Sequence, residues 1–575
     1  MQTVRPARRF SLFSRRTFLN PTRLWMLFLV ALLGVSLVLP LYELFRQAFL
    51  GPQGEFAGLT HFARFLASPA LMQSIGNTLL VAGCTTVVSV VLAFGFAFAV
   101  TRTDLRGRGF YRALVLLPLF APTMMHGIGL VYLLGNQGLI TTGLFGLLPW
   151  APKVELYGPL GIILAEIVYT FPQAYLILAA ALGSSDQRLY EAASVMGTGL
   201  LRRFFTLTLP SAKLGLLSAA FVCFTMSFTD FGAPKIVGGQ YAVLATDIYK
   251  QVIGQQNIAM GAVVGLLLTV PSVLAFIVDR LIARKQQAFV SARSVAYRPA
   301  PNRLRNLLCH LYCAGVCGAI LLLMGAVVLA SLVKVWPYNL SLSLQHYDFS
   351  QVAGEGLGPY WTSLKIALWT ALAGTVVTYF FAYLQEKTSG MHLLRSGAYF
   401  LSILPMALPG MVIGLGFIFF FNRPENPLHV MYGTAAILVL ANVVHFFSVP
   451  FLTALEALKK LDKDFEHVSE SMNVPFYRTL WRVTLPMTLP ALLEMALYYF
   501  VNAMVTVSAV VFLYTAELKP ASVAVVNMDD AGDVAPAAAM SVLILLTNAG
   551  VRLLYETAGV RWLRRRQAWL KRDRA

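Results

Sequence analysis

Long apolar runs separated by short polar segments recur along the whole chain. A helix needs about 20 apolar residues to cross a bilayer, and runs of that length occur from one end of the sequence to the other. The pattern predicts an all-α polytopic membrane protein with about twelve transmembrane helices. The predicted spans are residues 24–45, 73–100, 113–134, 159–182, 212–233, 260–279, 307–335, 360–385, 399–421, 431–454, 489–513 and 536–555.

The composition agrees with a chain that lies mostly in lipid. Of its 575 residues, 58% are hydrophobic and 12% are charged, and the mean hydropathy is +0.69. That leaves too little polar surface for a soluble globule. The five cysteines fall within predicted spans, so we expect neither a disulfide framework nor a metal site.

The net charge of +19 comes from basic residues gathered in short segments beside the spans. Basic residues favour the cytoplasmic side of a membrane, so we expect both termini in the cytoplasm and no nucleic-acid partner. The predicted order is a basic N-terminus at 1–23, a first half at 24–298, a linker at 299–306, a second half at 307–556 and a basic tail at 557–575.

The two halves of the chain repeat one another. LLPLFAPTMMHGIGL at 116–130 matches ILPMALPGMVIGLGF at 403–417, position by position. Helix-breaking residues at matched spacing indicate a duplicated six-span unit, with both copies in the same orientation. The repeat pairs Pro118 with Pro405, Pro122 with Pro409, and Gly127 with Gly414.

Each half also contains a polar segment, called an elbow below, in which a helix-forming stretch is broken before the next span. The first elbow is EAASVMGTGLLRRFFTLTLP, residues 191–210, and the second is FEHVSESMNVPFYRTLWRVTLP, residues 465–486. We expect the short amphipathic run after each break to end at the Leu-Pro pair. The repeat places Asn473 at the position of Gly197, which predicts a left-handed backbone there, because Gly tolerates it best and Asn next.

Glu-Ala-Ala followed by a glycine and then by Leu-Pro resembles the cytoplasmic EAA loop of type I ABC-importer permeases. The resemblance covers nearly the whole chain and implies two fused six-helix permease domains, similar to the iron(III), thiamine and putrescine branch. In that family the loop forms a coupling helix in a groove of a separate ATPase subunit.

The resemblance implies that two ATPase copies bind the elbows. The contact residues it implies are Glu191, Ala192, Ala193 and Gly197 in the first elbow and Glu466, Ser469 and Asn473 in the second. The second elbow departs from the family pattern, because His467, Val468 and Ser469 stand where Glu-Ala-Ala is expected. We therefore expect the two ATPase copies to dock unequally.

The chain lacks the sequence signatures of an ATPase and of several hydrolase classes. It contains no G-x-x-x-x-G-K-[ST] phosphate loop, no H-E-x-x-H zinc motif and no G-x-S-x-G nucleophile motif. We expect a transport subunit that is not an enzyme and binds no cofactor, with ATP and Mg bound by the partner ATPase.

Ionisable and helix-breaking residues inside the spans are candidates for a transport path. Charged groups are costly in a bilayer, and irregular backbone at membrane depth must line a cavity or contact protein. Glu166 and His445 lie deep in the fourth spans of their halves, and we expect the pair to face a shared polar path. Local polar packing, or a kink that fits one helix around another, is the alternative for each candidate. The candidates are Pro118, Pro122, Gly127, Glu166, Asp230, Pro405, Pro409, Gly414 and His445.

The stretch 228–257 indicates which solute the chain transports, through its resemblance to known permeases. Its Asp-Phe-Gly-Ala-Pro at 230–234 is similar to iron(III)-type permeases, and the stretch as a whole most resembles permeases assigned to 2-aminoethylphosphonate uptake. The resemblance implies a permease of the bacterial inner membrane, in contact with lipid, that imports 2-aminoethylphosphonate delivered by a periplasmic binding protein. Ferric iron, thiamine or a polyamine is the alternative solute. A twelve-span ion-coupled secondary transporter is the rival class, since it also has duplicated halves.

Overall fold

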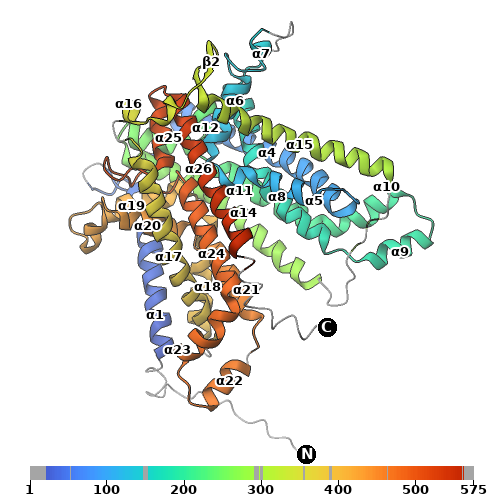
Figure 1. Cartoon of the computed structure of the whole chain (residues 1–575). Coiled ribbons are helices and arrows are strands. Elements are labelled where there is room, and N and C mark those ends of the chain that lie inside the picture. The colour runs from blue at the N-terminus through green and yellow to red at the C-terminus, as the bar shows by residue number, and fades with distance from the viewer. Residues whose placement is uncertain are drawn as a thin grey trace, which may run out of the picture.

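The spans predicted from the hydrophobic pattern are present as helices. The computed structural model describes residues 21–51, 54–146, 153–289, 297, 299, 302–353, 356–387, 391–462, 464–559 and 561 (Figure 1). Within these ranges, nine helices are long and apolar enough to cross a membrane, and three bent helix pairs bring the number to twelve if each pair is one span. The predicted basic N-terminus and basic tail lie almost entirely outside the described residues.

Nine spans are continuous helices, four of them with a π-helical turn. They are α1–η2–α2 (Pro21–Leu33, Gly34–Val38, Leu39–Ala48), α4 (Pro69–Arg102), α8 (Pro159–Gly183), α10–η4–α11 (Leu200–Arg203, Phe204–Thr208, Leu209–Thr229), α14 (Ile258–Phe289), α15 (Arg303–Leu332), α17 (Gly358–Lys387), α23–η9–α24 (Phe476–Thr479, Leu480–Thr484, Leu485–Val505) and α26–η10 (Val534–Leu554, Tyr555–Gly559).

The third span of each half is broken, as its prolines predict. The first-half pieces are α5 (Arg108–Val115) with η3 (Leu117–Phe120), and α6 (Thr123–Leu134); the second-half pieces are α18 (His392–Ile403) with η7 (Leu404–Ala407), and α19 (Gly410–Phe421). The pieces meet at 102° in the first half and at 111° in the second. Pro122 and Pro409 lie at the breaks in an extended conformation, with ψ of 146° and 140°. A helix cannot continue through that conformation.

The fourth spans differ between the halves. In the first half α8 continues through Pro172, whereas in the second half α20 (Ala435–His445) and α21 (Ser448–Lys459) bend by 57°. Shorter elements connect the spans at either end. They are α3 (Thr60–Ala67), α7 (Gly143–Gly146), α9 (Gln187–Val195), α12 (Gly232–Val237), α13 (Leu244–Tyr249), η5 (Lys250–Gly254), β1 (Val333–Val335), β2 (Asn339–Leu342), η6 (Gln345–Tyr347), α16 (Ser350–Ala353), η8 (Pro427–Met431), α22 (Asp464–Ser471) and α25 (Ala521–Asp530).

The fifth spans begin and end earlier than predicted. Residues 212–233 and 489–513 were the expected spans, whereas the helices run over Leu201–Thr229 and Phe476–Val505. The apolar segment that follows Val505 is largely buried and forms turns rather than helix. Hydropathy does not distinguish such a segment, buried among other helices, from one that crosses lipid.

The prediction that each elbow run ends at its Leu-Pro pair is wrong. A π-turn precedes each pair, and in it Leu209 and Leu485 donate their backbone N–H groups to carbonyls five residues back. The wider turn accommodates the next residue, a proline, which has no N–H to donate. Each elbow therefore continues into the fifth span as one helix.

The first span of each half packs against the other half. Figure 1 shows α1 beside α17 and α18, and α15 beside α4 and α5. In the second contact, the Tyr312 hydroxyl of α15 donates to the carbonyl of Leu92 at 2.7 Å, and the Trp336 indole N–H after α15 donates to the carbonyl of Gln137 at 2.7 Å. The halves are therefore joined by more than their linker.

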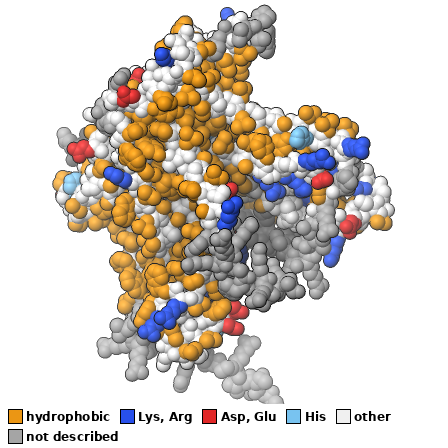
Figure 2. Space-filling view, in the orientation of Figure 1, with side chains coloured by type: hydrophobic (Ala, Val, Ile, Leu, Met, Phe, Trp, Pro, Cys, Tyr) orange, Lys and Arg blue, Asp and Glu red, His pale blue; other side chains and the backbone are white. Residues whose placement is uncertain are grey.

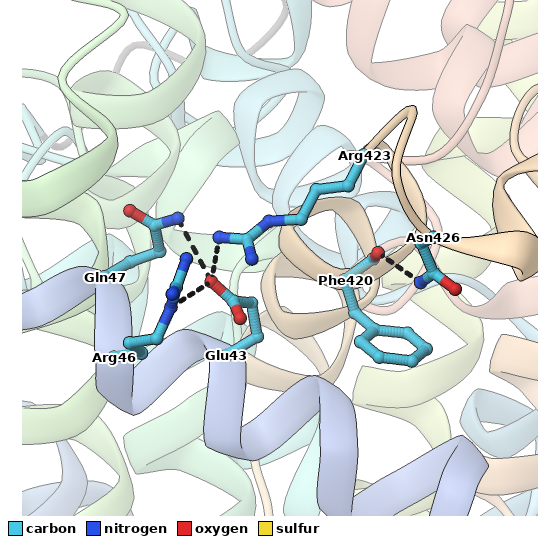
Figure 3. Close-up of polar contacts among 6 residues, drawn as sticks. All are labelled: Glu43, Arg46, Gln47, Phe420, Arg423 and Asn426. Atoms are coloured by element: carbon cyan, nitrogen blue, oxygen red, sulfur yellow. Dashed lines mark hydrogen bonds and ion pairs between the residues drawn. The ribbon is translucent and has the colours of Figure 1, made fainter. Parts of the chain in front are cut away.

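A polar contact also fixes the first span of the first half, α1–η2–α2, against the second half. The Glu43 side chain, 7% exposed, lies in the middle of α2 and accepts from the guanidinium of Arg423, which follows α19 in the second half (Figure 3). Arg46 Nε and Gln47 Nε2 donate to the same Glu43 oxygen at 3.1 and 3.2 Å. Nearby, Asn426 Nδ2 donates to the carbonyl of Phe420 at 2.8 Å and closes the Arg423 loop.

Apolar side chains cover most of the visible surface, and Lys and Arg occur on it in small, scattered groups (Figure 2). Large exposed hydrophobic residues occur along the spans, such as Phe28, Leu80 and Trp369. Outward-facing side chains of this kind suit a lipid environment, while a shared core of buried residues joins the two halves.

Candidate functional site

The two elbows share one backbone geometry. In the first, α9 is followed by Gly197 with φ of +67°, and in the second, α22 is followed by Asn473 with φ of +54°. This confirms the predicted left-handed position, which Gly and Asn adopt more readily than other residues.

Matching hydrogen bonds close both elbow helices. Thr198 N donates to the carbonyl of Ala193 at 3.1 Å, and Val474 N donates to the carbonyl of Ser469 at 2.8 Å. Each bond spans five residues, as in the Schellman motif at helix ends. The sequence alignment that pairs the two left-handed residues also relates these two bonds atom by atom. Ala193 and Ser469, two of the implied ATPase contacts, thus also shape the turns.

The implied ATPase-contact residues of the first elbow differ in exposure. Glu191, Ala192 and Gly197 are exposed, whereas Ala193 is 5% exposed. Glu191 accepts from Gln187 Nε2 at 3.2 Å, one helical turn earlier. The exposed residues are open to a partner, and their coupling role stays a prediction.

The second elbow presents different side chains at the same places. Asn473 and His467 are exposed, and His467 takes the place of Glu191. Ser469 is half-buried, and Glu466 turns inward to form an ion pair with Lys387 at 3.0 Å. The Glu466 carboxylate therefore binds the second span of its own half, α17.

Large apolar side chains stand exposed on both elbows. Met196 and its counterpart Met472 are 72% and 70% exposed, and Leu201 and its counterpart Tyr477 are 77% and 51% exposed. Grouped apolar side chains on an otherwise polar loop mark an interaction surface. Both elbows present such a surface at matched positions.

A cavity of about 360 Å³ lies between the two halves. The first half contributes residues of α8, α11 and α14, and the second contributes the break between η7 and α19, the bend between α20 and α21, and α24. Its polar lining residues are Tyr169, Gln173, Thr225, Thr229, Asp230, Asp279, His445, Ser448, Tyr498, Asn502 and Ser508.

Some of the predicted path residues line this cavity and others do not. Those that line it are Asp230, Pro405, Pro409 and His445. Those outside its lining are Pro118, Pro122, Gly127, Glu166 and Gly414. The broken third span thus reaches the cavity from the second half alone, and a role in the path stays a prediction for each residue.

Gly127 and Gly414 allow close helix packing. A Cβ atom on Gly127 would lie 2.8 Å from Ile236 Cβ, and one on Gly414 would lie 2.8 Å from the carbonyl oxygen of Ala509. Each glycine therefore lets its third span approach the segment that follows the fifth span of the same half.

The expected pairing of Glu166 with His445 needs correction. The sequence alignment that matches the two elbows pairs Tyr169 with His445, and Glu166 with Asn442. Tyr169 and His445 both line the cavity, whereas Glu166 and Asn442 are 0% and 1% exposed. The register of the repeat was the signal in the sequence that would have identified Tyr169.

The two halves contribute different charges to the cavity. Asp230 and Asp279 come from the first half, and the lining contains no Lys or Arg among the described residues. Asp230 caps the end of α11 and accepts from the backbone N–H of Ala233 at 2.9 Å. The Glu166 carboxylate is buried and lies beside Asp230 and Ser227. The cavity wall is therefore acidic on one side and neutral on the other.

Two six-span halves around a shared polar cavity, each with an elbow at the same end, define a duplicated membrane permease. The chain belongs to the family of binding-protein-dependent transport system inner membrane components, whose model matches residues 86–287 and 391–559. Members of this family are permease subunits of the inner membrane and are not themselves enzymes. The two matches confirm the fused, repeated permease domain.

Curated relatives of the chain include permeases of ferric and of 2-aminoethylphosphonate transport systems. The chain is 27% identical over 542 residues to the ferric transport system permease protein FbpB of Actinobacillus pleuropneumoniae, covering 92% of this chain and 77% of the relative. It is 29% identical over 507 residues to the putative ferric transport system permease protein FbpB 1 of Haemophilus influenzae, covering 86% and 78%. The putative 2-aminoethylphosphonate transport system permease protein PhnU of Salmonella paratyphi A is 28% identical over 273 residues, covering 46% of this chain and 91% of the relative.

Proposed function

We propose that this chain is the permease of an ATP-driven importer, with one ATPase copy docked on each elbow. The observation that carries the proposal is the matched pair of elbows, which share a left-handed turn and exposed apolar side chains. A secondary transporter needs no such paired docking surface. In this arrangement the elbows face the cytoplasm, and a periplasmic binding protein delivers the solute at the opposite end of the spans.

Movement of the elbows reshapes the cavity, because each elbow continues into a fifth span that lines it. The first elbow leads into α11, which bears Thr229 and ends at Asp230, and the second leads into α24, which bears Tyr498 and Asn502. Closure of the ATPases brings the elbows together and turns the cavity from one side of the membrane to the other.

We further propose that the solute is a cation, with ferric iron as the leading candidate. Asp230 and Asp279 offer carboxylate oxygens and the two tyrosines offer phenol oxygens, which suit a hard cation that passes through. Within the described residues, no three His, Cys, Asp or Glu side chains are grouped as in a resident metal site. The names of the two ferric relatives, which match most of the chain, support the same choice. Thiamine or a polyamine would also suit an acidic wall.

2-Aminoethylphosphonate is the second candidate. The PhnU match supports it, and Asp230 could hold its ammonium group. Its phosphonate, however, would meet no Lys or Arg among the described lining residues. Lys235 lies in the stretch that suggested this solute, and it is engaged by Asp530 at 2.6 Å.

Uptake into proteoliposomes tests the proposal. The permease is reconstituted with its ATPase and binding protein, and entry of ferric iron and of 2-aminoethylphosphonate is followed with and without ATP. We expect ATP-dependent entry of ferric iron. ATP-dependent entry of 2-aminoethylphosphonate without entry of ferric iron would show that 2-aminoethylphosphonate is the solute. Entry driven by an ion gradient without ATP would contradict the proposal that the chain is part of an ATP-driven importer.

A further inference from the structure

Each second span ends in a buried basic residue that contacts the same position of an elbow helix. In the first half Arg102 ends α4 and faces Tyr190, and in the second half Lys387 ends α17 and faces Glu466. The sequence alignment that matches the two elbows also pairs Tyr190 with Glu466.

The two basic residues occupy equivalent places in the repeat. The alignment of the second spans that pairs Arg102 with Lys387 also pairs Thr78 with Ser363, earlier in the same helices. Thr78 and Ser363 play matching roles, since their hydroxyls accept the backbone N–H groups at the start of α13 and α25, at 2.9 and 2.7 Å. Arg102 and Lys387 thus occupy equivalent positions in the two halves, although one side chain is a guanidinium and the other an ammonium group.

The first contact, called the arginine clamp, joins four segments. Arg102 is 2% exposed, and its guanidinium carbon lies 4.9 Å from the ring centre of Tyr190 and 4.2 Å from that of Tyr297, a residue between α14 and α15 in the sequence. Arg102 Nη2 also donates to the carbonyl of Leu182 at 2.9 Å, at the end of α8. A guanidinium favours both aromatic faces and a helix C-terminus.

The second contact, called the lysine clamp, is an ion pair beside a large cavity. Lys387 Nζ lies 3.0 Å from Glu466 Oε1, and the two side chains are 6% and 19% exposed. A cavity of about 920 Å³ lies alongside and is lined by both residues and by aromatic side chains such as Tyr383. Loss of one partner from a buried pair leaves the other charge without compensation.

The same second spans also form hydrogen bonds next to the wall of the cavity between the two halves. In α4, Ser89 hydrogen-bonds Thr170 at 2.7 Å, and Thr170 follows the cavity residue Tyr169. In α17, Thr378 hydrogen-bonds Tyr499 at 2.7 Å, and Tyr499 follows the cavity residue Tyr498. At a helical rise of about 1.5 Å per residue, each helix bridges roughly 14 to 20 Å between its clamp and this contact.

We propose that Arg102 and Lys387 are positioning residues that make the second spans carry elbow movement to the cavity wall. The proposal rests on the importer function proposed above. An elbow that moves without its clamp would still bind ATPase through its exposed surface, and less of its movement would reach Tyr169 or Tyr498. ATP hydrolysis would then continue with less solute moved.

The test measures solute moved per ATP hydrolysed in proteoliposomes that contain the permease, its ATPase and its loaded binding protein. Lys387→Ala is compared with wild type, with the charge swap K387E/E466K, and with Lys460→Ala as a control at an exposed lysine near the second elbow. We expect Lys387→Ala to keep its bound ATPase and to lower the ratio by about two- to thirtyfold. The charge swap should restore most of the ratio, and Lys460→Ala should leave it unchanged.

Several outcomes separate the clamp from simpler explanations. A wild-type ratio in Lys387→Ala overturns the proposal, as does a loss of transport that follows only from lost ATPase binding or a lowered Tm. If the charge swap does not fold, Lys387→Arg replaces it and must retain the ratio. Absence of ATP-driven transport by the wild type would instead overturn the importer function itself.

Discussion

The two halves agree in backbone and differ in chemistry. Gly197 and Asn473 hold the same left-handed turn, yet Glu191 of the first elbow is replaced by His467 in the second. In the first half Asp230 lines the cavity, with φ of −69° and ψ of 141°. The corresponding residue of the second half, Thr506, has nearly the same φ of −70° and ψ of 136° but carries no charge and is not part of the lining. Duplication has thus preserved the geometry while the charged groups became specific to one half.

This difference has a physical basis. A turn or a helix end often requires a left-handed backbone conformation. Because few residue types adopt that conformation readily, few substitutions are tolerated there. A side chain that faces a cavity or a partner is restricted only by what it must bind. Carboxylates from one half are therefore sufficient to bind a solute that passes between the two halves. The predictions below test this division of the charged groups between the halves.

The largest expected effect is at the acidic cavity wall. Asp230→Asn removes a charge from the first half and should lower the initial uptake rate of a cationic solute by about 10- to 100-fold, because a contact to a charged group is worth about 1.5 to 3 kcal/mol. Thr506→Val, the matched change in the second half, should stay within about twofold of wild type. Equal losses in the two variants would contradict the division of charge between the halves.

The next effect concerns the left-handed turns. Gly197→Trp should leave membrane insertion intact and lower ATPase affinity at the first elbow by about tenfold or more, because a non-glycine residue at this conformation costs about 1 to 2 kcal/mol and the ring adds bulk on the docking surface. Gly197→Asn copies the second elbow and should bind ATPase nearly as wild type. Co-purification of the ATPase measures both variants, and unchanged binding by Gly197→Trp would count against docking at this elbow.

The spans, the repeat and both left-handed turns could be predicted because each has a local signal, such as an apolar run or Gly197 aligned with Asn473. The exchange of α1 and α15 between halves could not, since nothing in an apolar helix states which neighbour it packs against. The cavity was predicted in part. Asp230 and His445 stood out as ionisable, and Tyr169 could have been identified only through the register of the repeat, which pairs it with His445. Asn502 is a side-chain type that occurs in many helices, so only the packing of the helices shows that it lines the cavity.

The exchanged helices supply a third test of how the halves depend on each other. Glu43→Ala leaves Arg423 without its carboxylate partner and should lower the free energy of unfolding by about 3 kcal/mol. Arg46→Ala removes a more exposed donor to the same oxygen and should cost at most about 1 kcal/mol. Thermal unfolding in detergent measures both, and equal shifts in Tm would show that the contact between halves adds little.

The smallest effect depends on pH and concerns Asp529 in the second half. Burial, followed by repulsion from Asp530, raises the pKa of Asp529 to about 6 in the folded protein, with Lys235 opposing the shift. The stability this carboxyl contributes is therefore complete below about pH 4 and is lost as pH rises through about 6. Asp529→Asn should raise Tm modestly at pH 7.5 and leave it unchanged at pH 4. A shift of equal size at both pH values would contradict this assignment.

The most direct measurement is the number of ATPase subunits bound to one permease chain, determined by native mass spectrometry of the purified complex. Two elbows with the same turn and exposed apolar surface predict two ATPase copies per wild-type chain, falling to one when Gly197→Trp disables the first elbow. A single ATPase copy on the wild-type chain would contradict the claim that shared backbone geometry makes both elbows docking sites, and so would two copies on Gly197→Trp.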